Sequence, residues 1–145
     1  MPVAALLALA LAADAPPPMP DWAAMPPLRY LHDPDITPPM TAFVRDEVKA
    51  GRCVLPPASG SGPGPATPAV PGAAMPDARI SLTVDVAVLV KADGMVVATI
   101  PHAIHCPTVE QYAAGLVTNF TRDNLVAHGP GELWYRTSVT FRWVP

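Results

Sequence analysis

The chain has 145 residues, enough for one modest domain, and most of its 21 prolines lie before Asp77. Its 9 Lys and Arg against 12 Asp and Glu give a formal net charge of −3, so no basic surface exists to attract nucleic acid. We therefore expect a poorly folded front half, a compact domain over residues 78–145 and no nucleic-acid partner.

Residues 1–15, MPVAALLALALAADA, form an apolar run. The run is too short for a membrane-spanning helix, which needs about 20 residues. Its small residues suit a secretory signal cleaved near 8–10 or 13–15, and an Ala-rich tail is the alternative. No Lys or Arg precedes the run. Either the signal is atypical, or the true start lies upstream and the run ends a membrane anchor. The sequence predicts export to the periplasm.

The Pro-rich segment 16–36 favours extended polyproline II geometry. Its apolar side chains are Trp22, Leu28, Tyr30 and Leu31. These side chains either dock on the domain or await a partner.

Residues 37–53 predict a short helix over about Pro39 to Ala50, with Thr37 as a possible N-cap and Gly51 as a stop. The side chains at helical spacing are Met40, Phe43, Val44, Glu47 and Val48. This stripe is narrow, so we expect the helix to lean on the main domain. Residues 54–77 read as a Pro/Gly/Ala linker with nothing to bury.

Cys53 and Cys106 are the only two cysteines. An even pair in an exported chain predicts a disulfide between them. The bridge would close a loop of about 50 residues and stabilise the domain by roughly 4 kcal/mol on the chain-entropy model.

A hairpin is predicted over residues 80–100. Apolar residues occupy every second position: Ile80, Leu82, Val84, Val86, Val88 and Val90. This period of two indicates a half-buried strand, and Asp93-Gly94 supplies the turn. MVVATI, residues 95–100, returns as a second strand that ends at Pro101.

An amphipathic helix is predicted from about Thr108 to Asn124, with capping-box spacing between Thr108 and Gln111. A last strand follows from Glu132 to Trp143, with Trp134 as a large aromatic on its polar face. The predicted class is α+β, a three-stranded antiparallel sheet packed on one helix (ββαβ) and preceded by a short helix and a Pro-rich linker.

His102, His105 and Cys106 carry side chains that bind zinc or copper, so a periplasmic metal carrier is one hypothesis. Neighbouring residues at a junction between a strand and a helix diverge, and no fourth ligand is evident. Catalysis has little support, because the chain has no nucleophile elbow, no phosphate loop and no carboxylate pair. We expect no enzyme and no cofactor.

Three segments together resemble the C-terminal domain of the TonB family: VDVAVLVKADGMVVATIP, PTVEQYAAGLVTNF and TSVTFRWV. The resemblance covers about residues 78–144 and implies a stand-alone exported relative. In that family the last strand binds a short segment of an outer-membrane transporter by strand addition. The implied partner is such an envelope protein or peptide, or a second copy through the same strand. The implied binding edge comprises Trp134, Arg136, Ser138, Thr140 and Arg142.

Overall fold

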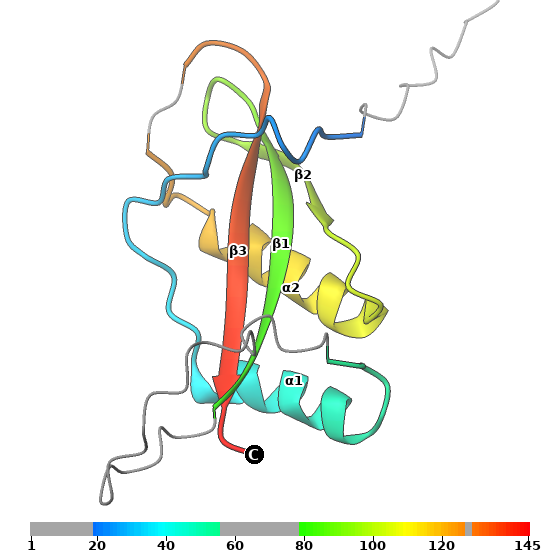
Figure 1. The fold of residues 1–145 in the computed structure, drawn as a ribbon. Helices are drawn as coiled ribbons and strands as arrows, with labels where there is room; N and C mark the ends of the chain where they lie inside the picture. Colours follow the sequence, from blue (N-terminus) through cyan, green and yellow to red (C-terminus); the bar gives the residue numbers. More distant parts are fainter. Residues whose placement is uncertain (1–18, 56–78, 127–128) are drawn as a thin grey trace, which may run out of the picture.

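The structure, a computed structural model, describes residues 19–55, 79–126 and 129–145 (Figure 1). These residues form α1 (Pro38–Lys49), β1 (Ile80–Val90), β2 (Val96–Pro101), α2 (Pro107–Phe120) and β3 (Leu133–Trp143). The strands make one antiparallel sheet in the order β2-β1-β3. The predicted α+β class is therefore confirmed. The signal-like segment 1–15 and most of the predicted linker 54–77 lie outside the described residues.

The sheet changes width along its length. β3 pairs with β1 over its whole length, from Ile80 to Val90, whereas β2 pairs only with Val86–Val90. We call the part around Val86–Val90 the upper part of the sheet, because it lies at the top of Figure 1. The lower part, around Ile80–Asp85, is a ribbon of β1 and β3 alone.

The turn between β1 and β2 forms as the sequence predicts. Gly94 has φ of +84°, a left-handed conformation that other residues avoid. The backbone N–H of Lys91 donates to the carbonyl of Met95 at 2.9 Å, and the carboxylate of Asp93 accepts the N–H of Met95 at 2.9 Å. These bonds close the hairpin and fix its register.

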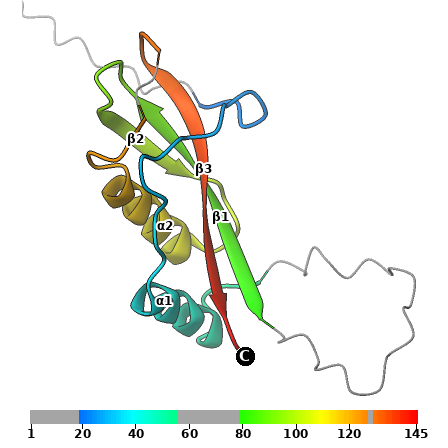
Figure 2. The same ribbon diagram turned by 90° about the vertical axis from the view of Figure 1, so that its left-hand side faces the viewer.

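Both helices lie on one face of the sheet (Figure 2). α2 contacts β2 and β1, and α1 contacts β3. The even-numbered residues of β1 point into this core, where Val84, Val86 and Val88 are fully buried. Val44 of α1 is fully buried as well. The sheet therefore packs against two helices. α2 is the helix expected to pack on the sheet, and α1 packs beside it.

The C-terminus of α1 is closed by a Schellman motif. Gly51 has φ of +73°. Its N–H donates to the carbonyl of Val48, and the N–H of Arg52 donates to the carbonyl of Glu47, both at 3.1 Å. The stop predicted at Gly51 is confirmed. Thr37 is the N-cap residue, but its side chain makes no capping bond.

α2 begins at Pro107 with Cys106 as its N-cap, and the capping box predicted for Thr108 and Gln111 was wrong. The carboxylate of Glu110 instead accepts the backbone N–H groups of Ile104 at 2.8 Å and Cys106 at 3.0 Å. The hydroxyl of Thr108 donates to Glu47 of α1. Because Glu110 already satisfies the donors that precede the helix, Thr108 is available to join the two helices.

α2 also ends at Phe120, earlier than the predicted Asn124. Asp123 has φ of +53°, which no helix can continue through. The hydroxyl of Thr121 donates to the carbonyl of Thr118 at 3.1 Å, and the amide of Asn124 donates to the carbonyl of Phe120 at 3.0 Å. Side chains therefore satisfy the last carbonyls, and the chain leaves the helix.

Residues 19–36, which we call the N-terminal strap, wrap around the sheet. The first part of the strap lies on the sheet face away from the helices (Figure 2), which we call the open face. The strap then reaches β3 and runs down to α1 (Figure 1). Leu28 joins the helix-side core, and Tyr30 packs against it. The strap side chains Leu28 and Tyr30 are therefore docked, whereas Leu31 is 57 % exposed.

Candidate functional site

The outer edge of β3 is occupied at one point by the strap. The N–H of Leu28 donates to the carbonyl of Arg136 at 2.7 Å, and the N–H of Arg136 donates to the carbonyl of Pro26 at 2.9 Å. Pro27 thus forms an isolated parallel bridge with Arg136. Pro26 and Pro27 have no N–H to offer, so this pairing does not extend along the strap as a regular strand.

Below Arg136 the edge is open. Backbone groups of successive residues in a strand point to opposite edges, so those of Ser138, Thr140 and Arg142 point outward as those of Arg136 do. In the described part of the chain, no backbone group pairs with these three residues on that side. Their outward donors and acceptors form a template for one further strand.

The side chains predicted as a binding edge lie together, but on the open face. In register, Trp134 lies opposite Leu89 and Arg136 opposite Ala87. Further down, the hydroxyl of Ser138 donates to the carboxylate of Asp85, and the hydroxyls of Thr140 and Thr83 share a hydrogen bond of 2.9 Å. An incoming strand would therefore meet the backbone of these residues at the edge, and their side chains would flank it on one face.

A cavity of about 300 Å³ lies on the helix side of the same edge. The residues that line it are Tyr30, Asp33, Pro34, Ile36, Phe120, Ser138, Val139 and Thr140. The hydroxyls of Tyr30 and Thr137 lie 3.1 Å apart and share a hydrogen bond. Burial raises the pKa of Tyr30, and the bond to Thr137 opposes this shift only in part. The cavity is a mixed apolar and polar surface next to the open edge.

Cys53 and Cys106 form a disulfide across 53 residues of sequence, as the sequence predicts. Both residues are buried, Cys106 completely. The bridge fixes the segment that follows α1 to the residue that precedes α2. Because Cys106 is consumed in this bond, it offers no thiolate to a metal.

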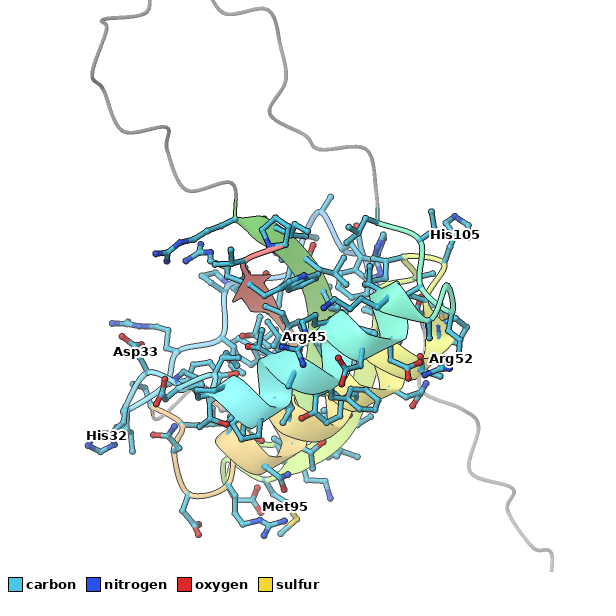
Figure 3. The ribbon with its side chains drawn as sticks, turned by 90° about the horizontal axis from the view of Figure 1, so that it is seen from below. His32, Asp33, Arg45, Arg52, Met95 and His105 are labelled. Carbon is cyan, nitrogen blue, oxygen red and sulfur yellow. A yellow bond between two sulfur atoms is a disulfide. The ribbon has the colours of Figure 1, made fainter. Side chains whose placement is uncertain are left out.

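The histidines of the predicted metal cluster diverge. The ring of His102 packs edge-on against Trp22, with ring centroids 4.8 Å apart. His105 is exposed and has φ of +62°. It lies near Arg52 at one end of α1, whereas His32 lies at the other end (Figure 3). The described residues hold no group of three or more His, Cys, Asp and Glu side chains placed to bind a metal ion.

A buried carboxylate joins the two helices beside the disulfide. Glu47 is 7 % exposed and accepts two hydrogen bonds from the guanidinium of Arg52, at 2.6 and 2.9 Å, and one from the hydroxyl of Thr108 at 2.8 Å. Hydrogen bonds from Arg52 and then from Thr108 lower the pKa of Glu47 to about 2. The sequence signal was the place of Glu47 in the apolar stripe of its helix.

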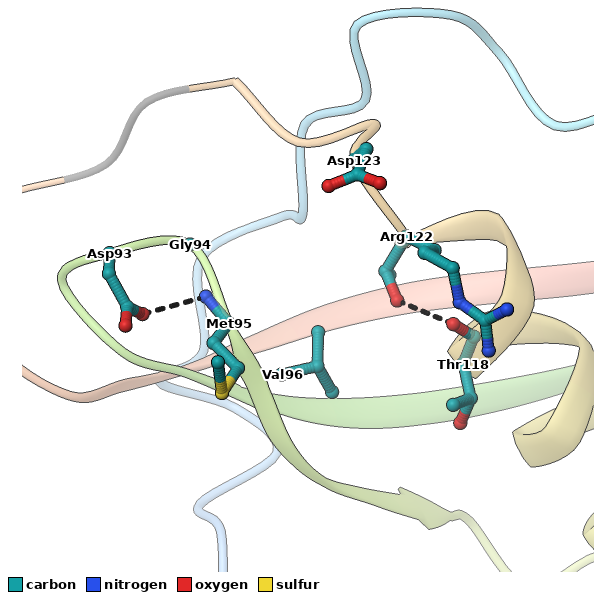
Figure 4. Close-up of a pocket in the computed structure, with 8 residues that line it drawn as sticks. Asp93, Gly94, Met95, Val96, Thr118, Arg122 and Asp123 are labelled. Carbon is teal, nitrogen blue, oxygen red and sulfur yellow. Dashed lines mark hydrogen bonds between the residues drawn. The ribbon is translucent and has the colours of Figure 1, made fainter.

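A second cavity, of about 370 Å³, lies between the hairpin turn and the end of α2 (Figure 4). Two of its polar side chains are engaged within the chain: Asp93 accepts the N–H of Met95, and Thr121 donates to the carbonyl of Thr118. The β3 edge, with its row of outward backbone groups that no described residue pairs with, is the better candidate for a binding site.

No protein-family model matches this chain, and no curated protein or solved structure matches it significantly. Within residues 19–55, 79–126 and 129–145, no helix has the length and apolar character needed to cross a membrane.

Proposed function

We propose that this protein is a non-enzymatic interaction module that binds an extended peptide or protein segment by strand addition. The segment would pair with the lower edge of β3, at Ser138, Thr140 and Arg142. The proposal rests on one observation: the outward backbone N–H and C=O groups of these residues form a row that no described residue pairs with. Main-chain hydrogen bonds supply affinity in this mode of recognition, and pockets for alternate side chains supply specificity.

The surroundings of the edge suggest which segment fits. Side chains of an added strand would alternate between the helix side and the open face. On the helix side they would meet the cavity that Tyr30, Ile36 and Val139 help to line. On the open face they would lie beside Thr140 and the exposed Arg142. We expect a partner with apolar residues at every second position and polar or acidic residues between them.

The cellular setting is part of the same proposal. The order of strand, strand, helix and strand supports the resemblance to the TonB C-terminal domain, in which the last strand is the binding strand. The Cys53–Cys106 bridge supports export, because disulfides persist in oxidising compartments such as the periplasm. The partner would then be an envelope protein, with an outer-membrane transporter segment as the first to test.

The test removes one outward donor without touching the β1 ladder. In Thr140→Pro the lost N–H points away from β1, and the ring obstructs an added strand. Thr140→Val is the matched control, because it loses the hydroxyl that bonds Thr83 but keeps the N–H. Both proteins are titrated with a panel of synthetic transporter peptides, and amide exchange is recorded.

We expect a peptide of the panel to bind both the wild type and Thr140→Val. In the wild type, binding should newly protect the amides of Ser138, Thr140 and Arg142 from exchange. Thr140→Pro should bind at least about tenfold more weakly, since it loses a main-chain bond and gains a steric block. Equal binding by all three proteins, or an absence of protection across the panel, would contradict strand addition. If sedimentation shows that the wild type self-associates and Thr140→Pro does not, the occupant of the edge is a second copy.

A further inference from the structure

The upper part of the open face is apolar and covered, unlike the lower part. Ala87 and Leu89 of β1 point away from the helices, yet they are 0 % and 4 % exposed. In the strap, Pro20 and Met25 are buried. Figure 2 shows the strap passing over this face. The strap therefore supplies the second cover of the sheet where β1 has apolar residues on both faces.

The strap makes few directional bonds to the surface that it covers. Two backbone bonds join it to β3, through Pro26 and Leu28. Two more join it to the turn after α2: the N–H of Leu31 donates to Asn124 at 2.8 Å, and the N–H of Val126 donates to Arg29 at 3.0 Å. The side chain of Asn124 adds two bonds to the backbone of His32. No disulfide or ion pair holds the strap among the described residues.

The strap ends its pairing with β3 where the open edge begins. It bonds to Arg136, and the next outward residues toward Trp143 are those without a partner. A strand that pairs with the lower edge and grows upward would meet the strap at Arg136. The covered surface and the proposed binding edge are therefore one continuous strip of β3, occupied in its upper part by the protein itself.

We infer that the surface under the strap is a docking site for an extended, proline-containing apolar segment of a partner protein, and that the strap is its displaceable intramolecular occupant. The chemistry of the partner follows from the occupant. The strap docks with buried apolar residues, Pro20, Met25 and Leu28, and it offers β3 only the backbone groups that its prolines leave available. The inference extends the proposed function upward along β3, and it can fail separately because it uses different residues.

A tethered strap competes at a high effective concentration, on the order of millimolar for a short connection. A free segment of the same chemistry would therefore bind poorly to the wild-type chain and well once the strap is loosened. A covalently locked strap should prevent binding. This ordering separates a displaceable occupant from a fixed part of the fold.

Tyr30 and Leu125 are suitable positions for an engineered disulfide that locks the strap in place. They form an isolated antiparallel bridge flanked by the bonds from Leu31 to Asn124 and from Val126 to Arg29. This arrangement is a non-hydrogen-bonded pair, in which Cα atoms lie about 4.5 Å apart, within the range that a disulfide spans. The double variant Tyr30→Cys/Leu125→Cys ties the strap to the turn. Tyr30→Ser/Leu125→Ser is the matched control, with the same side chains removed and no tie.

The probe is a labelled synthetic peptide of residues 19–31, titrated into the wild type and both double variants by fluorescence anisotropy. Peptide mapping verifies in each variant that Cys53 remains bonded to Cys106. We expect the Ser/Ser variant to bind at least about tenfold more tightly than the wild type, and the locked variant not to bind. Addition of Thr140→Pro to the Ser/Ser variant should leave this binding intact, because the probe covers the upper edge.

Equal binding by the locked and Ser/Ser variants would overturn the inference. It would also be overturned if the Ser/Ser variant failed to bind the probe while amide exchange showed the N–H of Leu28 unprotected. If that N–H stays protected, Leu28→Asp is added to both double variants and the same comparison decides. If Thr140→Pro abolishes binding of the transporter peptide but no variant binds the strap probe, the proposed function is retained. Only the strap is then rejected as a displaceable occupant.

Discussion

α1 and the N-terminal strap both precede the sheet in the chain and both lie against it, but they are held in opposite ways. α1 is followed by a disulfide to the start of α2 and carries a buried carboxylate that bonds α2. The strap is held by four backbone bonds, by the side-chain bonds of Asn124 and Tyr30, and by a few apolar side chains, with no covalent tie. The covalent tie makes α1 a permanent part of the core, whereas local opening of the strap requires little to be broken.

The largest expected effect comes from removing the covalent tie. Cys53→Ala/Cys106→Ala should lower the free energy of unfolding by about 4 kcal/mol, because a closed loop of this size restricts the unfolded chain. Urea denaturation of the variant and the wild type measures the difference. A variant as stable as the wild type would show that α1 is held by its other contacts, and the contrast with the strap would disappear.

The Glu47 network should make the α1 attachment sensitive to acid. Arg52 and Thr108 hold the folded-state pKa of Glu47 at about 2, below the ordinary value of 4.5. A depressed pKa contributes stability above the ordinary value, and this contribution is lost as the pH falls from 4.5 toward 2. Denaturation at a series of pH values should show that Glu47→Gln has a flatter acid limb than the wild type. Parallel curves would mean that the network does not titrate with folding.

The strand pattern of this chain was predictable, and the reason is visible in β1. Its β-branched residues alternate, and the even positions are the ones that enter the helix-side core, as at Val84. The alternation says nothing about the other face, where Ala87 and Leu89 are also buried. What covers them is a Pro-rich segment without periodicity, and its contacts are distant in sequence: Tyr30 bonds Thr137, 107 positions later.

The open edge of β3 was predictable only in part. Alternation in the last strand places Ser138, Thr140 and Arg142 in one row, and the sheet order leaves that strand at an edge. The sequence could not show that Arg136 is already paired, because a backbone bond to Leu28 depends on tertiary docking and not on side-chain identity. The disulfide was predictable from the presence of only two cysteines together with the expected export of the chain.

Leu28→Ala should loosen the strap and leave the rest of the fold in place. Leu28 is 9 % exposed and belongs to the core, so its truncation should cost about 2 kcal/mol, the low end for a buried leucine. We expect this cost to appear as local opening: faster amide exchange at Leu28 and Arg136, with slow exchange retained in β1. Equal acceleration throughout β1 would show that strap and sheet unfold together, and the comparison with α1 would then have to be abandoned.

The smallest effect is expected at the Tyr30 hydroxyl. Tyr30→Phe removes its bond to Thr137, which contributes about 1 kcal/mol. Burial raises the pKa of Tyr30, so docking favours the neutral phenol. This contribution is present below the ordinary tyrosine pKa of about 10 and is lost as the pH rises through the raised value. Strap opening is measured by amide exchange at neutral pH and by tyrosinate absorbance in alkali. In the wild type, opening should therefore increase in alkali. In Tyr30→Phe the alkaline increase should be absent, whereas a wild-type response retained by the variant would place the titrating group elsewhere.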